Sequence, residues 1–502
     1  MRADPPARLS RGDVVAGISV ALILIPQSMA YAELAGLPPH LGLYAASLPL
    51  IAAAFLASSP YLQTGPVALT ALMTFGALSP LATTGTLEYA ALAALLALVV
   101  GVARIAVGLL KAGWLVYLMS HSMMNGFLSA AAILIMSSQL PGALGSDAPS
   151  GGVLQRAWWS LTTPDSWELA SIGLAAFTVV LVSAGRRIHP LVPGVLIATV
   201  AGSAFSVVTE YSGPTIGNIP GGLPPFSVDL PWARLPQLIV PGIVISVVGF
   251  AEGVSIARLF ASQERQRWDA NREFLSKGVA CVVSAFISGM PVGGSLSRTS
   301  VNRLSGAHSR WSGLVTGVTV LLFLPFAAVL NPLPRAVLSG IVIAAVWAVV
   351  RPRALAFLWE LAPAQALVGW GTFVLTLFLS PHIDQAILVG VTLSAIVHLW
   401  REITPKLTAR REGDTLYLEP SGVLWFGSAR GMEDRLLARL ADEPGLTRVV
   451  LRLGGLGRID LTGAYTLVEI VDHVEGAGIE MTLEDVPEHA ARVLKAVGVH
   501  RT

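Results

Sequence analysis

The sequence predicts an α-helical membrane protein with a small soluble α/β domain at its carboxyl-terminal end. Of its 502 residues, 54% are hydrophobic and 13% are charged, whereas soluble domains carry roughly 25% charged residues. The charges are uneven, because 29 of the 64 charged residues lie at positions 401–502. Between Val14 and Val100 only Glu33 and Glu88 are charged. A soluble fold of that length would need a charged face, so residues 1–404 are predicted to form a bilayer domain.

A bilayer helix needs about 20 apolar residues, and twelve stretches of the chain meet this need. They lie near 14–31, 42–57, 88–110, 115–138, 168–185, 190–209, 237–257, 273–290, 311–330, 335–350, 361–380 and 385–400. Two shorter apolar stretches, at 66–79 and 292–304, begin beside Gly or Pro. Counting them gives 14 transmembrane segments, and leaving them out gives 12.

The basic residues favour 14 segments with both termini in the cytoplasm. Cytoplasmic connections are enriched in Lys and Arg, and here the basic residues follow the even-numbered segments. They are Arg104, Lys111, Arg186, Arg187, Arg258, Arg265, Arg267, Arg272, Arg303, Arg310, Arg351, Arg353, Arg401, Lys406, Arg410 and Arg411. With 12 segments this alternation would fall out of phase.

The two short stretches occupy the third position of each half when the segments are divided into seven plus seven. Interrupted segments in equivalent positions are the strongest sequence indication of a transporter's binding site. The first contains the run Gly65–Val67, and the second contains Gly293–Arg298, with two serines and a fixed positive charge. Helix N-termini meeting there would suit an anion. Alternatively, the glycines permit close helix packing and Arg298 extends to the cytoplasmic interface.

Polar side chains inside the apolar segments are candidates for substrate and proton binding. Gln27 and Tyr31 are four residues apart and share a helical face, which favours contact with a substrate. Glu33 points elsewhere, and a carboxyl group held away from water can carry a proton. Glu252 lies inside the eighth segment. The alternatives are that Glu33 meets water at the outer rim and that Glu252 supports helix packing.

The composition argues against other classes of protein. Cys281 is the only cysteine, so a disulfide within the chain is impossible, and its apolar surroundings indicate a core residue. Catalytic pairs, metal-spaced His or Cys clusters and nucleotide-binding loops are not found in the sequence. We therefore predict no enzyme, no metal and no cofactor. A net charge of +2 argues neither for nor against a nucleic-acid partner, but no basic stripe appears in the sequence, and we predict no such partner.

The charged tail is predicted to be a separate domain at 414–502, after a linker at 405–413. Runs rich in β-branched and aromatic residues at 415–420, 423–426 and 448–453 are typical of strands. Residues 459–464 then lead into a helix. A unit of about 90 residues is large enough to fold alone.

Several of these runs resemble those of one known family. Residues 26–39 (PQSMAYAELAGLPP), followed by Gly42, Leu43 and Tyr44, resemble the signature of the sulfate permease family, also called solute carrier family 26. Residues 294–299 (GSLSRT) are similar to its tenth-segment motif, and residues 269–274 (DANREF) to the loop before its ninth segment. The similarity covers nearly the whole chain.

The resemblance implies two seven-helix inverted repeats, at about 1–209 and 236–404, arranged as UraA-like core and gate domains. It also implies a homodimer and a cytoplasmic STAS domain. In this family the anion site lies between the third and tenth segments and is lined by the first and eighth. Carried over, that assigns substrate binding to Gln27, Tyr31, Gly65, Pro66, Val67, Glu252, Ser295, Leu296, Ser297 and Arg298.

Thr462 is a candidate regulatory phosphosite by the same resemblance. In related anti-sigma-factor antagonists the matching position is a phosphorylatable Ser or Thr. The alternative is that the Thr462 hydroxyl caps the N-terminus of the following helix. The tail lacks the long insertion of animal members of the family, which indicates a prokaryotic origin and a multi-pass protein of the cell inner membrane.

The function expected from these features is secondary active transport of a small anion by alternating access. We expect proton-coupled symport through Glu33, with a dicarboxylate such as fumarate, sulfate or bicarbonate as the substrate. Sodium-coupled bicarbonate symport is the alternative, because Glu252 resembles the ion-site position of such carriers in the family. A channel-like chloride or anion conductor remains open, as does a membrane sensor whose tail binds a signalling partner.

Overall fold

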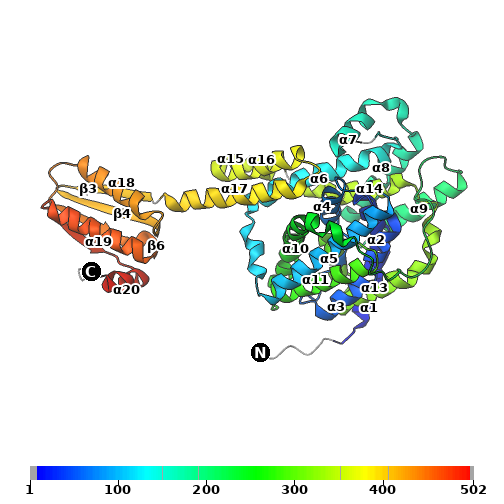
Figure 1. The fold of residues 1–502 in the computed structure, drawn as a ribbon, viewed down its shortest axis with the longest axis horizontal. Coiled ribbons are helices and arrows are strands. Elements are labelled where there is room, and N and C mark those ends of the chain that lie inside the picture. Colours follow the sequence, from blue (N-terminus) through cyan, green and yellow to red (C-terminus); the bar gives the residue numbers. More distant parts are fainter. Residues whose placement is uncertain (1–7, 150, 190, 351, 405, 498–502) are drawn as a thin grey trace. The chain divides into compact units, whose positions relative to one another are not determined.

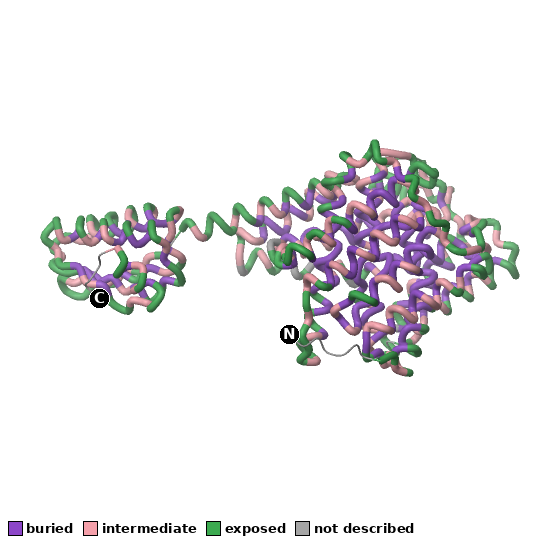
Figure 2. The backbone as a smooth tube through the Cα atoms, turned by 60° about the horizontal axis from the view of Figure 1, so that its bottom comes forward, coloured by how far each residue is buried: buried purple, intermediate pink, exposed green. Residues whose placement is uncertain are grey.

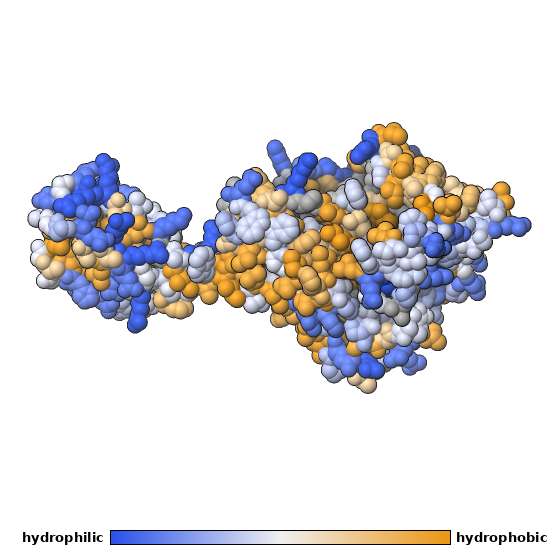
Figure 3. All heavy atoms as spheres, turned by 90° about the horizontal axis from the view of Figure 1, so that it is seen from above, coloured by the Kyte–Doolittle hydropathy of each residue, from blue (hydrophilic) through white to orange (hydrophobic). Residues whose placement is uncertain are grey.

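The computed structural model describes residues 8–149, 151–189, 191–350, 352–404 and 406–497. The chain folds into two compact units that divide between Val391 and Thr392. The first is a bundle of helices and the second contains a five-stranded sheet (Figure 1). On the face in Figure 3, apolar side chains cover much of the helical unit, as a bilayer requires, while the smaller unit is mainly hydrophilic.

Helices form at all fourteen predicted apolar stretches. These are fifteen helices, because α2 and α3 share the stretch at 42–57: α1 Arg11–Leu34, α2 Pro39–Ala45, α3 Leu48–Leu56, α4 Ala68–Leu78, α5 Leu87–Leu109, α6 His121–Leu144, α8 Leu169–Ile188, α9 Gly194–Val208, α10 Leu235–Gln263, α11 Ala270–Phe286, α12 Leu296–Leu304, α13 Trp311–Phe323, α14 Arg335–Val346, α16 Pro363–Phe378 and α17 Ile383–Ile403. Among the described residues, seven helical stretches are long and apolar enough to cross a bilayer, and five apolar helices are shorter. A total of fourteen spans therefore stays a prediction.

Three details differ from the predicted segments. The stretch at 42–57 is not one helix, because the chain breaks after α2 and restarts at α3, which has Pro49 in its first turn. Two amphipathic helices, α7 Val153–Thr162 and α15 Pro352–Leu361, were not expected. Arg104 is not in a loop after the fourth segment but is fully buried within α5.

The helices of the first unit pack into two groups. The core group consists of α1 to α5 and α10 to α13, in which α11 packs on α5 and α3, and α1 packs on α12 and α13. The gate group consists of α6, α8, α9, α14 and α16, in which α6 packs on α16 and α14, and α8 on α14 and α9. Helix α1 also contacts α9 and α14, so it lies where the groups meet. Buried residues fill the interior of the unit (Figure 2).

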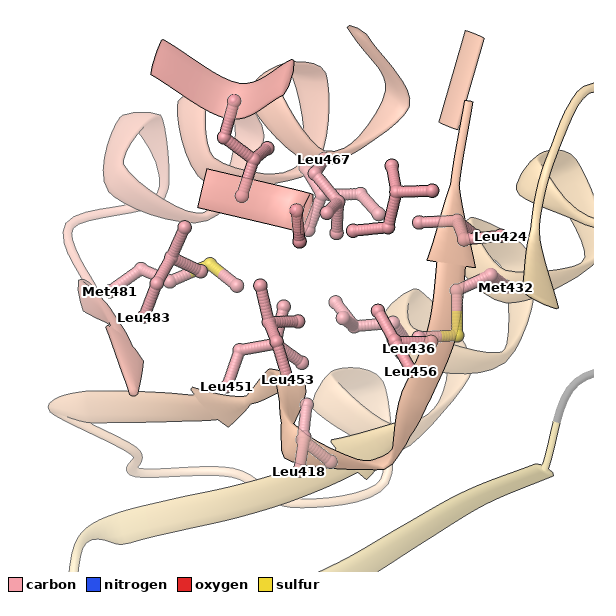
Figure 4. Close-up of a cluster of buried hydrophobic side chains, with 14 of the residues drawn as sticks. Leu418, Leu424, Met432, Leu436, Leu451, Leu453, Leu456, Leu467, Met481 and Leu483 are labelled. Atoms are coloured by element: carbon pink, nitrogen blue, oxygen red, sulfur yellow. The ribbon is translucent and has the colours of Figure 1, made fainter. Parts of the chain in front are cut away.

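The second unit is a sheet covered by helices. Strand β4 Thr415–Leu424 pairs antiparallel with β3 Lys406–Glu412 and parallel with β5 Arg448–Arg452, which pairs parallel with β7 Glu480–Glu484. Strand β6 Leu456–Ile459 pairs with the far end of β4. Helices α18 Ala429–Ala441, α19 Leu461–Gly476 and α20 Glu488–Ala496 follow the strands. Leucines and methionines from sheet and helices, including Leu418, Met432, Leu451 and Leu467, fill the core between them (Figure 4).

Two sequence predictions about this unit need correction. The expected linker at 405–413 holds strand β3, which is paired along its whole length with β4. Position 405 lies outside the described residues. The N-cap of α19 is Asp460, whose Oδ1 accepts from the Gly463 N–H at 2.8 Å, and not Thr462. Thr462 is an exposed residue of the first turn of α19.

Candidate functional site

The two interrupted elements meet in the middle of the core group. Residues Thr64–Gly65 (β1) and Gly293–Gly294 (β2) form a short antiparallel pair, with Gly65 opposite Gly293. A Cβ atom on Gly294 would lie 3.1 Å from the Cα of Gly253 on α10, so the backbone of β2 approaches α10 closely. Helices α4 and α12 begin just after the two strands. Their N-termini, the positive ends of the helix dipoles, are thereby brought together.

Arg298 is the central polar residue of this region. It lies in the first turn of α12, whose N-cap is Ser295, and the Ser295 hydroxyl accepts from the Arg298 N–H. The Arg298 side chain is 1% exposed, yet Nε, Nη1 and Nη2 have no hydrogen-bond partner among the described residues. Nη2 would lie 3.3 Å from a Cβ atom on Gly65. The guanidinium is therefore buried beside β1 with its donors unused.

Helix α1 supplies the polar groups expected from the sequence. Gln27 is 1% exposed, and neither its amide nitrogen nor its amide oxygen has a hydrogen-bond partner in the part of the chain that the structure describes. Tyr31 is one turn further along and lies near Arg298. Glu252 of α10, which is half-buried, interacts electrostatically with Arg298. Residues from the first, eighth and tenth segments thus converge on one guanidinium.

A cavity of about 200 Å³ adjoins Arg298 and lies between the two helix groups. Ser297, Arg298 and Ser300 of α12 line it from the core group, and Val182 of α8 and Val195 of α9 line it from the gate group. The predicted Ser297 therefore faces this cavity, whereas Leu296 is 48% exposed. Buried donors at the edge of a cavity are typical of a binding site.

Three further predicted residues lie in the backbone that leads into α4. Val67 is the N-cap residue of α4 and gives no side-chain cap, and Pro66 precedes it. Just before them, the Thr64 hydroxyl accepts from Lys277 Nζ at 2.5 Å. Gly65, Pro66 and Val67 shape the backbone at the start of α4.

Glu33 is not part of this cluster. Its carboxylate pairs with Arg335 of the gate group, with Oε1 and Nε 3.3 Å apart. It lines a second cavity of about 70 Å³, together with Ser138, Gln139 and Arg156. The expectation that Glu33 points away from Gln27 and Tyr31 agrees with this placement.

Two buried cations near β1 and β2 were not predicted from the sequence as parts of the site. Lys277 of α11 is 1% exposed and pairs with Glu273 at 3.1 Å, and it donates to Thr64 of β1. Arg104 of α5 is fully buried and donates to the carbonyl oxygen of Val292, just before β2. The available signal was a charged residue inside an apolar stretch, which is costly in a membrane unless it has a role.

Comparison with known proteins places these features in context. The sequence model of the sulfate permease family matches residues 11–372, and that of the STAS domain matches 406–502. A probable sulfate transporter of Mycobacterium tuberculosis is 30% identical over 98% of this chain and 92% of its own length. Sulfate transporter 4.1, chloroplastic, of Arabidopsis thaliana is 34% identical over 81% of this chain, but this chain spans only 61% of its length.

Solved structures show the same fold. The murine solute carrier 26 family member A9, an anion transporter in the inward-facing state, has a TM-score of 0.88 at 20% identity and covers 98% of this chain and 89% of its own. The transmembrane domain of the cyanobacterial bicarbonate transporter BicA has a TM-score of 0.66 at 24% identity, over 76% of this chain and 97% of its own.

Proposed function

Because this chain belongs to the sulfate permease family, a family of anion transporters, we propose that it carries a small anion across the membrane by alternating access. The observation that carries this proposal is Arg298, which is buried at a cavity with all three side-chain nitrogens unused. A buried charge whose hydrogen-bond donors are unpaired costs several kcal/mol. An anion bound at the N-termini of α4 and α12 would offset that cost.

The substrate-binding residues proposed are those that converge on this guanidinium or shape its surroundings. Arg298 would pair with the anion, Gln27 and Tyr31 would contact it from α1, and Ser297 would face it from the cavity. Gly65, Pro66, Val67, Ser295 and Leu296 would supply backbone at the two helix starts, and Glu252 would tune the charge of Arg298. The relatives named as sulfate transporters support sulfate as the substrate, and the bicarbonate transporter of similar fold supports bicarbonate.

Proton symport through Glu33 is the coupling that we propose, with sodium symport through Glu252 as the second candidate. Glu33 joins the core group to the gate group through Arg335, so its protonation would loosen that link. Glu252 is favoured by its electrostatic interaction with Arg298. A carboxylate beside the bound anion could hold a sodium ion, whose single positive charge would offset the negative charge of the carboxylate.

The cellular setting follows from the same features. We propose that both termini are cytoplasmic and that the protein lies in the inner membrane, because basic residues lie at or just after the ends of α8, α12 and α17, in the positive-inside pattern. We also propose a homodimer, as the family resemblance implies. Thr462 is exposed at the first turn of α19, so a kinase could reach it. A phosphate there would meet the positive end of a helix dipole.

The test is uptake into proteoliposomes of labelled sulfate, bicarbonate, chloride and fumarate, with imposed proton or sodium gradients. We expect saturable uptake of at least one anion, stimulated by an inward proton gradient and abolished in the Arg298→Ala variant. Large currents that do not saturate would indicate a channel instead. Absence of both uptake and current for every anion would contradict the proposed function.

A further inference from the structure

Arg104 is the most completely enclosed cation of the core group. Its side chain is fully buried in α5 and makes four hydrogen bonds. Nη1 donates to the Val292 carbonyl oxygen at 2.5 Å and to Cys281 Sγ at 3.3 Å. Nε and Nη2 donate to the carbonyl oxygens of Ser246 and Ile245 on α10, at 3.3 and 3.4 Å. One side chain therefore ties α5, α10 and α11 to the segment that leads into β2.

The charge of Arg104 is not balanced by a carboxylate. In the described ranges, no acidic side chain lies within ion-pair distance of its guanidinium, whose partners are three carbonyl oxygens and one thiol. Lys277, the neighbouring buried cation, differs because Glu273 neutralises it at 3.1 Å. A buried ion that is solvated only by neutral groups is expensive. It also projects its field into its surroundings with little screening.

Arg104 also sets the direction of a peptide group at the candidate site. The Val292 carbonyl points to Arg104, and because a trans peptide is planar, the N–H of Gly293 points the opposite way. The preceding Met290 carbonyl is likewise held by the Ser284 hydroxyl, at 2.7 Å. The two carbonyl oxygens before β2 thus accept hydrogen bonds from side chains of the core group. The negative ends of these carbonyl dipoles therefore point toward those side chains.

We propose that Arg104 is a positioning residue of the anion site and sets its preference for divalent over monovalent anions. It holds the segment before β2 in place, and its unbalanced charge adds to that of Arg298 beside β1. Coulomb energy scales with the charge of the ligand, so an added positive charge favours a divalent anion twice as strongly in free energy as a monovalent one. This inference rests on the proposed anion transport at the same site.

The scaling gives a sharp test. If loss of the Arg104 charge weakens the binding of a monovalent anion by some factor, it should weaken the binding of a divalent anion by the square of that factor. For example, if the loss weakens the binding of a monovalent anion roughly tenfold, it should weaken that of a divalent anion roughly a hundredfold. Nitrate and sulfate are suitable probes, measured as inhibition constants against uptake of the transported anion.

Two variants remove the net charge by different routes. Arg104→Gln keeps hydrogen-bond donors without a charge. Cys281→Asp places a carboxylate where the thiol lies 3.3 Å from Arg104. In this second variant the guanidinium is kept, together with its bonds to Val292 and α10. Arg104→Lys and Cys281→Ser are the matched controls that keep the net charge. Arg187→Met, at an exposed arginine of α8, controls for loss of any cation.

We expect the ratio of the nitrate to the sulfate inhibition constant to fall about tenfold in Arg104→Gln and in Cys281→Asp, and to stay at the wild-type value in the three controls. A purely structural role of Arg104 would lower the maximal rate and the thermal stability but leave that ratio unchanged. An unchanged ratio in folded Cys281→Asp would therefore overturn the inference, even if Arg104→Gln did not fold. Absence of uptake of every anion by the wild type would instead overturn the proposed function.

Discussion

Glu33 Oε1 lies 3.3 Å from Arg335 Nε, in an ion pair that joins the two helix groups of the membrane unit. Glu33 belongs to the last turn of α1 in the core group, and Arg335 is the first residue of α14 in the gate group. The Arg335 side chain is 51% exposed, and exposed ion pairs contribute only about 0–1 kcal/mol. The link is therefore weak enough to break during each cycle of a carrier.

Glu33→Gln should remove the response of uptake to pH while leaving anion binding intact. Protonation of Glu33 abolishes the ion pair with Arg335, so a permanently neutral side chain would mimic the protonated state. The measurement is initial uptake into proteoliposomes with and without an inward proton gradient. In the wild type the gradient should raise uptake, and in Glu33→Gln it should have no effect.

Glu88→Gln is the matched control, because Glu88 of α5 also forms an exposed ion pair, at 3.8 Å, but its partner Arg234 is the N-cap of α10 in the same core group. It should keep the pH response. If sodium drives uptake at constant pH, the proton assignment is wrong. Glu252 is then the carboxylate to substitute.

Arg298→Met should abolish anion binding without loss of stability. The variant removes no hydrogen bond of the side chain, since Nε, Nη1 and Nη2 have no partner among the described residues. Taking an ion out of water costs several kcal/mol, so loss of a buried charge that makes no side-chain hydrogen bond should not lower the stability of the fold. Thermal unfolding in detergent, with and without sulfate, measures both effects.

Sulfate should raise the unfolding temperature of the wild type, because a ligand that binds only the folded state stabilises it, and should have no effect on Arg298→Met. Ser297→Ala should retain most of the stabilisation, since the backbone N–H groups at the start of α12 persist. A sulfate-induced shift in Arg298→Met equal to that of the wild type would place the anion elsewhere.

Much of the membrane unit could be predicted from the sequence because bilayer burial leaves a strong compositional signal. The low charge between Val14 and Val100 predicted helices, and the Gly and Pro residues beside 66 and 292 predicted the two interruptions that meet as β1 and β2. The roles of Arg104 and Lys277 could not be predicted. Their partners come from α10, α11 and the strands, at distances along the chain that no local pattern encodes.

The domain boundary was missed for a related reason. Residues 406–412 are highly charged (KLTARRE), and such a run resembles an exposed linker. As an edge strand of the sheet, β3 has one side paired with β4 and its charged side chains in water. Natural edge strands are commonly charged because charge prevents further pairing.

Truncation after Thr404 should give a better-behaved membrane domain than truncation after Gly413. The longer fragment would keep β3 but lose β4, its partner in seven residue pairs, and an unpaired strand promotes aggregation. Size-exclusion profiles in detergent measure the monodisperse fraction. Equal aggregation of both fragments, with a stable full chain, would show that the membrane domain depends on the sheet domain.

Gly65→Ala should weaken anion binding by more than its cost in stability can explain. Gly65 has a φ of +141°, a backbone conformation that side-chain-bearing residues rarely adopt, and an added Cβ would lie 3.3 Å from Arg298 Nη2. Backbone strain of this kind costs about 1–3 kcal/mol, and the new methyl group would also displace the guanidinium. Gly85→Ala separates these effects, because Gly85 has a φ of +78° and nothing within 4 Å of an added Cβ. Both variants should unfold at a lower temperature than the wild type. Only Gly65→Ala should raise the sulfate concentration needed for half-maximal stabilisation. Equal sulfate affinity in the two variants would show that Gly65 does not border the anion.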